Sequence, residues 1–245
     1  MVFCVESPVV AAGPTHLTGP RPHTETMRVG VLSDIHANRV ALEAVFEDMP
    51  PVDALVCAGD VVGYNPWPGE CIDVLCQRDV PTIMGNHDRA VATGTGFGGN
   101  GMADAGARYA RKAIDAAQLE WLRGLPTERT CFDGRLKLVH GHPDDPNRYT
   151  YPALFSPDLL GEEDVLVMGH THVQAYERYD EGVVMNPGSV GQPRDGDPRA
   201  AYAVVDLDSL TVEQHRVDYD IERVIEAVVA AGLPEGTGTR LKKGR

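Results

Sequence analysis

The sequence predicts an α/β fold in which a second β-sheet follows a largely parallel one. Short continuous apolar runs bounded by turn residues are typical of buried strands, and they recur from about residue 29 to residue 169. Segments with apolar residues at helical spacing separate the first of these runs. After Thr130 the pattern changes to strands joined by short turns, which indicates the second sheet. A chain of 245 residues with 42% hydrophobic residues can bury one sizeable core.

The first half of the chain alternates strands and helices. Residues 1–26 are rich in Pro, Thr and Gly, and we expect a disordered or mis-assigned N-terminal extension before a single domain at 27–245. Alternation of strand and helix implies right-handed crossovers and a largely parallel sheet. The strands are expected at residues 29–33, 54–59 and 82–85, and the helices at 37–49 and 69–79.

The second half predicts a loop, two helices and a mainly antiparallel sheet. A glycine-rich loop is expected at 88–101, followed by one helix over 103–125. Short turns at 180–182 and 206–208 indicate strands that reverse direction. A helix over 221–231 ends at Gly232 and Pro234. The basic tail at 240–245 is expected to be solvated.

Composition narrows the function classes. The net charge of −14, from 36 acidic and 22 basic residues, disfavours extended nucleic-acid binding, because an acidic surface repels phosphates. Scarce lysine together with many Asp residues favours a halophile as the source. No apolar stretch is long enough to span a membrane, and no secretory signal is recognisable, so we expect a cytoplasmic protein. The sequence leaves homo-oligomer formation open.

Polar residues follow the apolar runs, where the carboxyl ends of strands in an open α/β sheet gather ligands. On extended backbone, residues two apart project to the same face, so each pair of such residues can point into one cleft. Imidazoles, carboxylates and an amide oxygen together indicate a metal site. The residues concerned are Asp34, His36, Asp60, Asn86, His87, His140, His142, His170 and His172.

The donor set favours two divalent ions. Asp60 stands alone after its strand, which suits a carboxylate that bridges two ions. A site of His, Asp and Asn without thiolate favours Mn, with Fe, Zn, Co or Ni as alternatives, over Ca. Spacing alone does not distinguish His140 from His142 as the ligand.

Five motifs resemble those of the calcineurin-like metallophosphoesterases, in order and at plausible spacing. The similarity runs from about Met27 to the C-terminus and is strongest to the small prokaryotic branch of YfcE-type predicted phosphodiesterases. The five motifs are Asp34-Ile35-His36, Gly59-Asp60, Gly85-Asn86-His87-Asp88, His140-Gly141 and Gly169-His170-Thr171-His172.

This resemblance implies a four-layer αββα sandwich of two mixed β-sheets flanked by helices. It implies one metal held by Asp34, His36, Asp60 and His172, and another held by Asp60, Asn86, His140 and His170. His87 and Asp60 would be the catalytic residues. A metal-bound hydroxide would attack phosphorus, and His87 would act as the general acid, a role typically worth 10²–10⁴ in rate.

We therefore expect a metal-dependent phosphoric ester hydrolase that acts on a small phosphodiester or nucleotide. The alternatives are a protein or phosphomonoester phosphatase, a DNA-processing nuclease, and a non-catalytic scaffold of the same fold. Asn86, His87 and Arg194 are candidates for substrate contact. Tyr64, Trp67 and Arg148 could also contact substrate. Positions in surface loops are the simpler explanation for these three residues and for Arg194.

Overall fold

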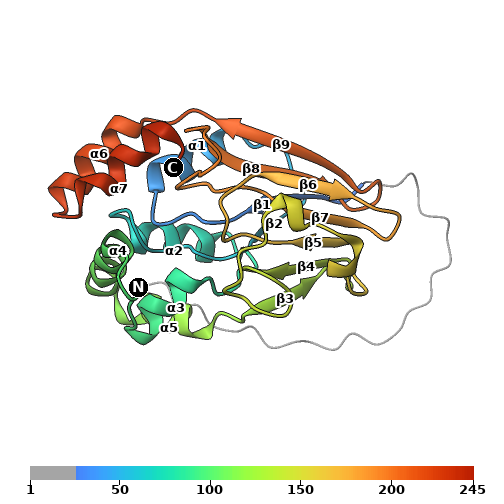
Figure 1. The fold of residues 1–245 in the computed structure, drawn as a ribbon, viewed down its shortest axis with the longest axis horizontal. Helices are drawn as coiled ribbons and strands as arrows, with labels where there is room; N and C mark the ends of the chain where they lie inside the picture. Colours follow the sequence, from blue (N-terminus) through green and yellow to red (C-terminus); the bar gives the residue numbers. More distant parts are fainter. Residues whose placement is uncertain (1–25) are drawn as a thin grey trace.

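The computed structural model describes residues 26–245 (Figure 1). The extension predicted at 1–26 therefore lies outside the described residues, apart from Thr26. Within this part of the chain, no helix combines the length and apolar character needed to cross a membrane.

Two sheets form the centre of the molecule (Figure 1). The first has the order β2-β1-β8-β9 and the second the order β3-β4-β5-β7-β6. The strands of the first sheet are β1 (Arg28–Leu32), β2 (Ala54–Cys57), β8 (Ala200–Asp206) and β9 (Thr211–Val217). Those of the second are β3 (Glu128–Cys131), β4 (Leu136–Val139), β5 (Val165–Val167), β6 (Ala175–Arg178) and β7 (Val183–Asn186).

Both sheets are mixed, so the expectation of one largely parallel and one mainly antiparallel sheet is wrong. In the first sheet β1 pairs parallel with β2, whereas β8 is antiparallel to β1 and β9. In the second, β5 pairs parallel with β4 and β7. The strand predicted at 82–85 is reduced to a single bridge between Thr82 and Cys57. Pro81 has no N–H to extend that ladder, and α3 already begins at Asn86.

The helices confirm part of the prediction and correct the rest. The loop expected at 88–101 begins as α3, and the helix expected at 103–125 is two helices. The break occurs at Asp115, whose carboxylate accepts from Gln118 N while the Gln118 side chain accepts from Asp115 N, a capping box that starts a new helix. The α-helices are α1 (Arg39–Asp48), α2 (Pro68–Gln77), α3 (Asn86–Thr93), α4 (Gly101–Ala113), α5 (Ala116–Gly124), α6 (Ile221–Ala230) and α7 (Glu235–Thr239).

Alternation along the strands divides the core into layers, because successive side chains point to opposite faces of a sheet. On β8, Ala203 and Val205 pack between the two sheets, whereas Tyr202 and Val204 pack toward the helices. On β5, Val165 and Val167 face the space between the sheets and Leu166 faces the opposite side.

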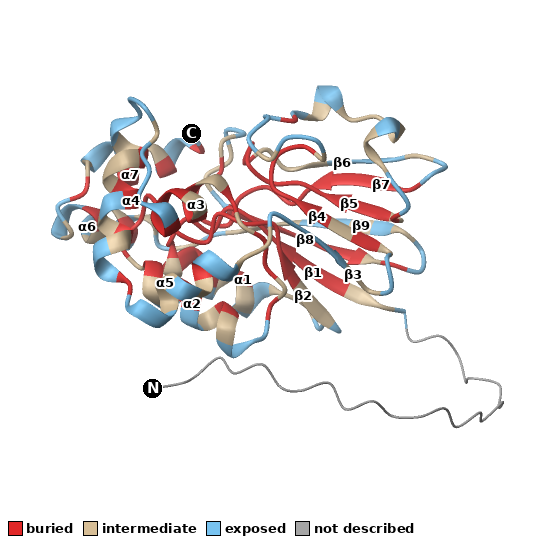
Figure 2. Ribbon diagram, turned by 90° about the horizontal axis from the view of Figure 1, so that it is seen from below, coloured by how far each residue is buried: buried red, intermediate tan, exposed pale blue. Residues whose placement is uncertain are grey.

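The layers form the expected four-layer sandwich, with a thin fourth layer. The helical layer covers the first sheet, and α6 and α7 pack beside it around Val224 and Val228. The segment that contains the 3₁₀ turns η1 (Pro152–Leu154) and η2 (Pro157–Leu159) covers the outer face of the second sheet with Phe155, Leu159 and Leu160. Figure 2 shows that the buried parts of the central strands continue into the loops between the sheets and the helices.

Helix α4 packs against the loop after β2 without room for a side chain. A Cβ on Gly106 would lie 2.3 Å from the backbone N of Tyr64 and 2.6 Å from its Cα. A Cβ on Gly101, in the first turn of the same helix, would meet nothing within 4 Å. Helix α4 and the Tyr64 loop are therefore fixed against each other by direct backbone contact.

Substituting Gly106→Ala is expected to lower the free energy of unfolding by about 1–3 kcal/mol, because overpacking must move one backbone. The matched variant Gly101→Ala is expected to leave it unchanged or to raise it by up to about 1 kcal/mol. Urea unfolding of both variants tests this contact, and an equal effect of the two substitutions would contradict it.

Candidate metal centre

The segments that follow four strands and open α3 converge at one edge of the two sheets. Among residues 26–245, three buried groups of side chains have ligand atoms within 4.8 Å of one another. All the predicted His and Asp ligands belong to these groups, and Asp60 and His36 each belong to two. The groups are Asp34, His36 and His172; His36, Asp60 and His87; and Asp60, His140 and His170.

Left-handed backbone conformations aim these side chains inward. The prediction that residues two apart would share a face of extended backbone is wrong in its geometry, since each of these residues lies in a turn just after a strand. Positive φ is uncommon for residues other than Gly and costs about 1–3 kcal/mol each, and such strain gathers at functional sites. The φ values are +52° for Asp34, +48° for His36, +54° for Asp60, +66° for His170 and +59° for His172.

Two of the ligand-bearing segments begin with a glycine because a neighbouring loop occupies the space that a side chain would need. A Cβ on Gly85 would lie 2.0 Å from Oδ1 of Asp60. A Cβ on Gly169 would lie 2.1 Å from Oγ of Ser33 and 2.9 Å from Oδ2 of Asp34. Gly85 and Gly169 thus let one ligand-bearing loop contact another.

Hydrogen bonds orient the two carboxylates so that one oxygen of each faces the imidazoles. Oδ2 of Asp34 accepts from Ser33 Oγ and from His170 N, which leaves Oδ1 3.1 Å from Nε2 of His172. Oδ1 of Asp60 accepts from His87 N at 2.8 Å. Its Oδ2 lies 3.3 Å from Nε2 of His140 and 3.7 Å from Nε2 of His36, between two of the groups.

Backbone carbonyls orient the imidazoles. Nδ1 of His36 donates to Val62 O, Nδ1 of His140 to Ala58 O, and Nδ1 of His172 to Gln192 O. Where the ring is neutral, as in His36 and His172, the proton then resides on Nδ1, so Nε2 presents a lone pair to the centre. Nε2 of His36 and Nε2 of His172 face each other at 3.1 Å. His170 is oriented the other way round, with Nε2 bonded to Asn147 O at 3.1 Å.

The carboxylates stay ionised although they are buried. Burial alone would raise the pKa of Asp34, but the charge and hydrogen bond of His172 hold it far below its ordinary value. The same conflict, decided by His140, places the pKa of Asp60 well below its ordinary value. Burial disfavours a charged His140 ring, yet the charge and hydrogen bond of Asp60 outweigh it and raise the His140 pKa to about 10. The centre therefore has two fixed negative charges that attract cations.

This donor set fits divalent metal ions. Facing lone pairs of His36 and His172 repel each other unless a cation or a proton lies between them. Their 3.1 Å separation is that of two nitrogens bound to one ion at about 2.0–2.1 Å and roughly a right angle. Oδ1 of Asp34, which is buried 3.1 Å from Nε2 of His172, adds an oxygen donor at the same place.

Asn86 and His87 enter the centre from the N-terminus of α3. Oδ1 of Asn86 lies 3.1 Å from Nε2 of His140. The ring of His87 contacts those of His36, Tyr64 and Phe97, with centroids 4.7, 4.6 and 4.3 Å away. Its Nδ1 is buried without a hydrogen-bond partner. Burial lowers the His87 pKa to about 4.

His142, which spacing could not distinguish from His140, does not belong to any of the three groups. Its Nδ1 accepts from the backbone N of Asp144, and the surrounding loop closes through backbone bonds between His142 and Asp145. His142 therefore has a structural role in the loop after β4.

A small polar cavity of about 130 Å³ opens above the centre. Arg194 lines it, as the sequence predicted, whereas the basic tail is not simply solvated: Arg240 is half-buried and also lines the cavity. Tyr64, which the sequence would also have allowed in a surface loop, is buried in the wall of this cavity. Sequence reasoning missed Phe97, Asn100, Tyr149 and Arg240, which lie in loops or at the chain end and have no strand before them.

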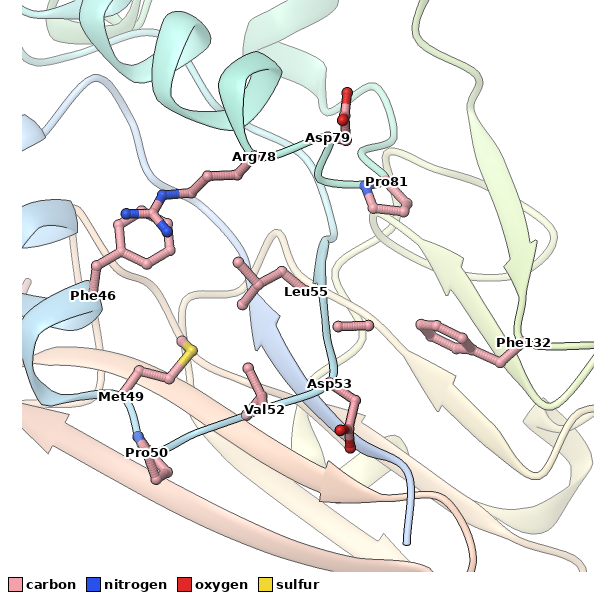
Figure 3. Close-up of a pocket in the computed structure, with 11 residues that line it drawn as sticks. Phe46, Met49, Pro50, Val52, Asp53, Leu55, Arg78, Asp79, Pro81 and Phe132 are labelled. Carbon is pink, nitrogen blue, oxygen red and sulfur yellow. The ribbon is translucent and has the colours of Figure 1, made fainter. Parts of the chain in front are cut away.

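A larger cavity, of about 620 Å³, lies elsewhere, next to the exposed edge of β2 (Figure 3). It is lined mainly by apolar side chains, including Met49, Leu55 and Phe132, with Arg78 over the ring of Phe46. Two acidic residues, Asp53 and Asp79, also line it, and Asp53 accepts a hydrogen bond from Arg28 N. None of the predicted ligands lines it, so the smaller cavity is the candidate active site.

The chain is similar to known phosphoesterases over most of its length. The model of the calcineurin-like phosphoesterase superfamily domain matches residues 27–210. The uncharacterized protein MJ0912 of Methanocaldococcus jannaschii is 31% identical over 239 residues, covering 89% of this chain and 98% of the relative. Phosphodiesterase YfcE of Escherichia coli is 31% identical over 192 residues, covering 76% and 91%. The crystal structure of a metallophosphoesterase from Sphaerobacter thermophilus superposes with a TM-score of 0.79 at 36% identity, covering 90% and 100%.

Substituting Asp60→Asn is expected to lower the bound metal per protein to less than half of the wild-type value, since Asp60 connects two of the ligand groups. The matched variant His142→Gln removes an imidazole outside these groups and is expected to keep the wild-type metal content. Elemental analysis after manganese loading and desalting measures both. Equal metal content in the wild type and D60N, with circular dichroism showing a folded protein, would contradict this assignment.

Metal-free protein is expected to lose stability as the pH falls from 6.5 toward 4. Burial lowers the pKa of several imidazoles, so the unfolded chain takes up protons that the folded chain does not. Asp88 opposes this: burial and the charge of Asp60 raise its pKa to about 7, so the folded state binds a proton between pH 7 and 3.8. Four imidazoles have a lowered pKa, against the one raised carboxyl of Asp88: His36, His87, His170 and His172.

Because the imidazoles outweigh one carboxyl group, chelator-treated protein should have a lower urea midpoint at pH 5 than at pH 7. An equal or higher midpoint at pH 5 would mean that these rings are already protonated in the folded state.

Proposed function

The chain belongs to the calcineurin-like phosphoesterase superfamily, and we propose that it uses two divalent metal ions to hydrolyse a small phosphodiester or nucleotide. The observation that supports this most directly is the arrangement of His36, His140 and His172. Their Nδ1 atoms are engaged by backbone carbonyls, and their Nε2 atoms surround two ionised carboxylates. A phosphoric ester hydrolase of this family requires such a ligand set for its divalent metals.

Each proposed ion has one of the ligand groups. Asp34, His36 and His172 would hold the first, and His140, His170 and Asn86 the second. Asp60 would be shared, since its Oδ2 lies between Nε2 of His36 and Nε2 of His140. We propose manganese, with Fe, Zn, Co or Ni as alternatives, because the donors are nitrogen and oxygen without thiolate. When bound, the ions would activate a water and neutralise charge that develops at phosphorus.

His87 is the proposed proton donor to the leaving oxygen. Its pKa of about 4 makes it neutral in the free protein, where the ring can donate a hydrogen bond to a phosphoryl oxygen. A phosphate bound beside the ring would raise this pKa, because nearby negative charge favours the imidazolium form. The contacts of the ring with Tyr64 and Phe97 hold it at the cavity wall.

The size of the cavity supports a small substrate. At about 130 Å³ it is well below the 300–1,000 Å³ typical of sites that enclose a drug-sized ligand, so only the phosphoryl end of a substrate would enter. The net charge of −14 supports a small phosphoester rather than extended nucleic acid. Turnover of bis-p-nitrophenyl phosphate against p-nitrophenyl phosphate, with Mn²⁺, tests the preference for a diester over a monoester. Absence of hydrolysis with every divalent ion tried would refute the catalytic proposal.

Substituting His87→Gln is expected to lower kcat by a factor of about 10²–10⁴ on esters with a poor leaving group, such as an alkyl phosphodiester. The loss should be smaller with p-nitrophenyl esters, since p-nitrophenolate leaves without a proton. Steady-state kinetics at matched metal content measure both, with His142→Gln as the control. An equal loss on both ester types would contradict a general-acid role.

A further inference from the structure

Two arginines face the candidate active site without an acidic partner. Arg194 and Arg240 both line the 130 Å³ cavity. Among residues 26–245, neither guanidinium has an Asp or Glu oxygen within 4.0 Å, although 36 acidic residues are available in a chain with only 22 basic ones. Nη2 of Arg194 donates to Tyr64 Oη and Gln192 Oε1, and its Nε is buried without a hydrogen-bond partner. Nε of Arg240 donates to the backbone oxygen of Arg245. Within the described part of the chain, no Asp or Glu carboxylate therefore compensates the positive charge on this wall.

Arg240 reaches the cavity from outside the residues that the family model matches, which end at 210. It begins the 3₁₀ turn η3 (Arg240–Lys243) directly after α7. Leu241 beside it is fully buried against α6, and Gly196 N donates to Gly244 O on the far side of the turn. The last turn of the chain is thus anchored at two positions that follow Arg240, which limits where its side chain begins.

The charges around the cavity exceed what one phosphodiester requires. Two divalent ions bring four positive charges, of which Asp34 and Asp60 cancel two. The remaining two match an attacking hydroxide and one singly charged phosphodiester. Arg194 and Arg240 add two more, which a second phosphate group would neutralise. Planar guanidinium forks are well suited to bind phosphate oxygens in pairs.

We propose that Arg194 and Arg240 form a second anion subsite, which binds a phosphate group adjoining the phosphorus that is attacked. The preferred substrates would then be nucleotides or related compounds that contain a phosphoanhydride, rather than esters with a single phosphate. This inference rests on the proposed function, because the metal centre sets where the first phosphate binds. The phosphates would bind in the cavity that both arginines line, and a nucleoside would remain at its mouth near the half-exposed ring of Tyr149.

The test uses binding as well as turnover, so that it does not depend on hydrolysis. Calorimetry on the manganese-loaded full chain compares AMP, which has one phosphate, with α,β-methylene-ADP, which has two and resists cleavage. Wild-type protein is expected to bind α,β-methylene-ADP more tightly. Arg240→Gln should reduce that preference about 10- to 100-fold, as expected for loss of charge-assisted hydrogen bonds, and Arg240→Lys should restore part of it. Arg194→Gln should act in the same direction.

The matched control is Arg223→Gln, which removes an exposed arginine of α6 that does not line the cavity. It should keep the wild-type preference. Equal binding of the two nucleotides by wild-type protein, or an unchanged preference in R240Q, would overturn the subsite. A preference that depends on Arg240 in a protein that hydrolyses no phosphoester would support the subsite and refute only the proposed function.

Discussion

Burial of two ionised carboxylates is the constraint on which the rest of the site depends. Asp34 and Asp60 are buried with at most 1% of their surface exposed, where an uncompensated charge costs several kcal/mol. His140, whose pKa Asp60 raises to about 10, supplies part of that compensation as an imidazolium. Backbone carbonyls of Val62, Ala58 and Gln192 fix the orientation of His36, His140 and His172. Those carbonyls belong to segments far apart in sequence. The loops of both sheets must therefore be in place together for either carboxylate to be stable.

Backbone strain in these loops occurs at the residues that would bind the metal ions. Left-handed conformations at Asp34, Asp60 and His172 are held by the two packed sheets beneath them, whose inward residues form a continuous apolar layer. Gly85 and Gly169 allow the loops to touch without a side chain between them. The packing of the two sheets thus offsets the conformational strain of the loops at their edge. This is the usual relation between a rigid scaffold and its functional loops.

Much of the fold and most of the site could be predicted from local patterns. Apolar runs ending in Asp34, Asp60, His140 and His170 fixed the strands and the edge where the ligands meet. The strand at 82–85 could not be excluded locally, because its loss depends on Pro81 and on the early start of α3. The direction of the strands likewise depends on β8, which pairs with β1 although it lies far along the chain: Arg28 pairs with Asp206, 178 residues later.

Residues that reach the site through tertiary packing left no sequence signal. In the sequence, Arg240 resembles any basic chain end, and its place in the cavity depends on the burial of Leu241 beside it. Tyr64 resembles a loop residue, and its burial depends on the contact of α4 at Gly106. Such residues are distinguished from ordinary loop and chain-end residues only when three features are considered together. These are the anionic ligands of the centre, the basic wall of the cavity and the net negative charge of the surface.

Anomalous diffraction from crystals of the manganese-loaded protein, recorded on both sides of the manganese absorption edge, tests most directly whether two metal ions share Asp60. Two peaks are expected roughly 3.5–4 Å apart, one on each side of the Asp60 carboxylate. The peaks should lie beside His36 and His172 and beside His140 and His170. A single peak, or peaks away from Asp60, would contradict a shared carboxylate as the centre of this site.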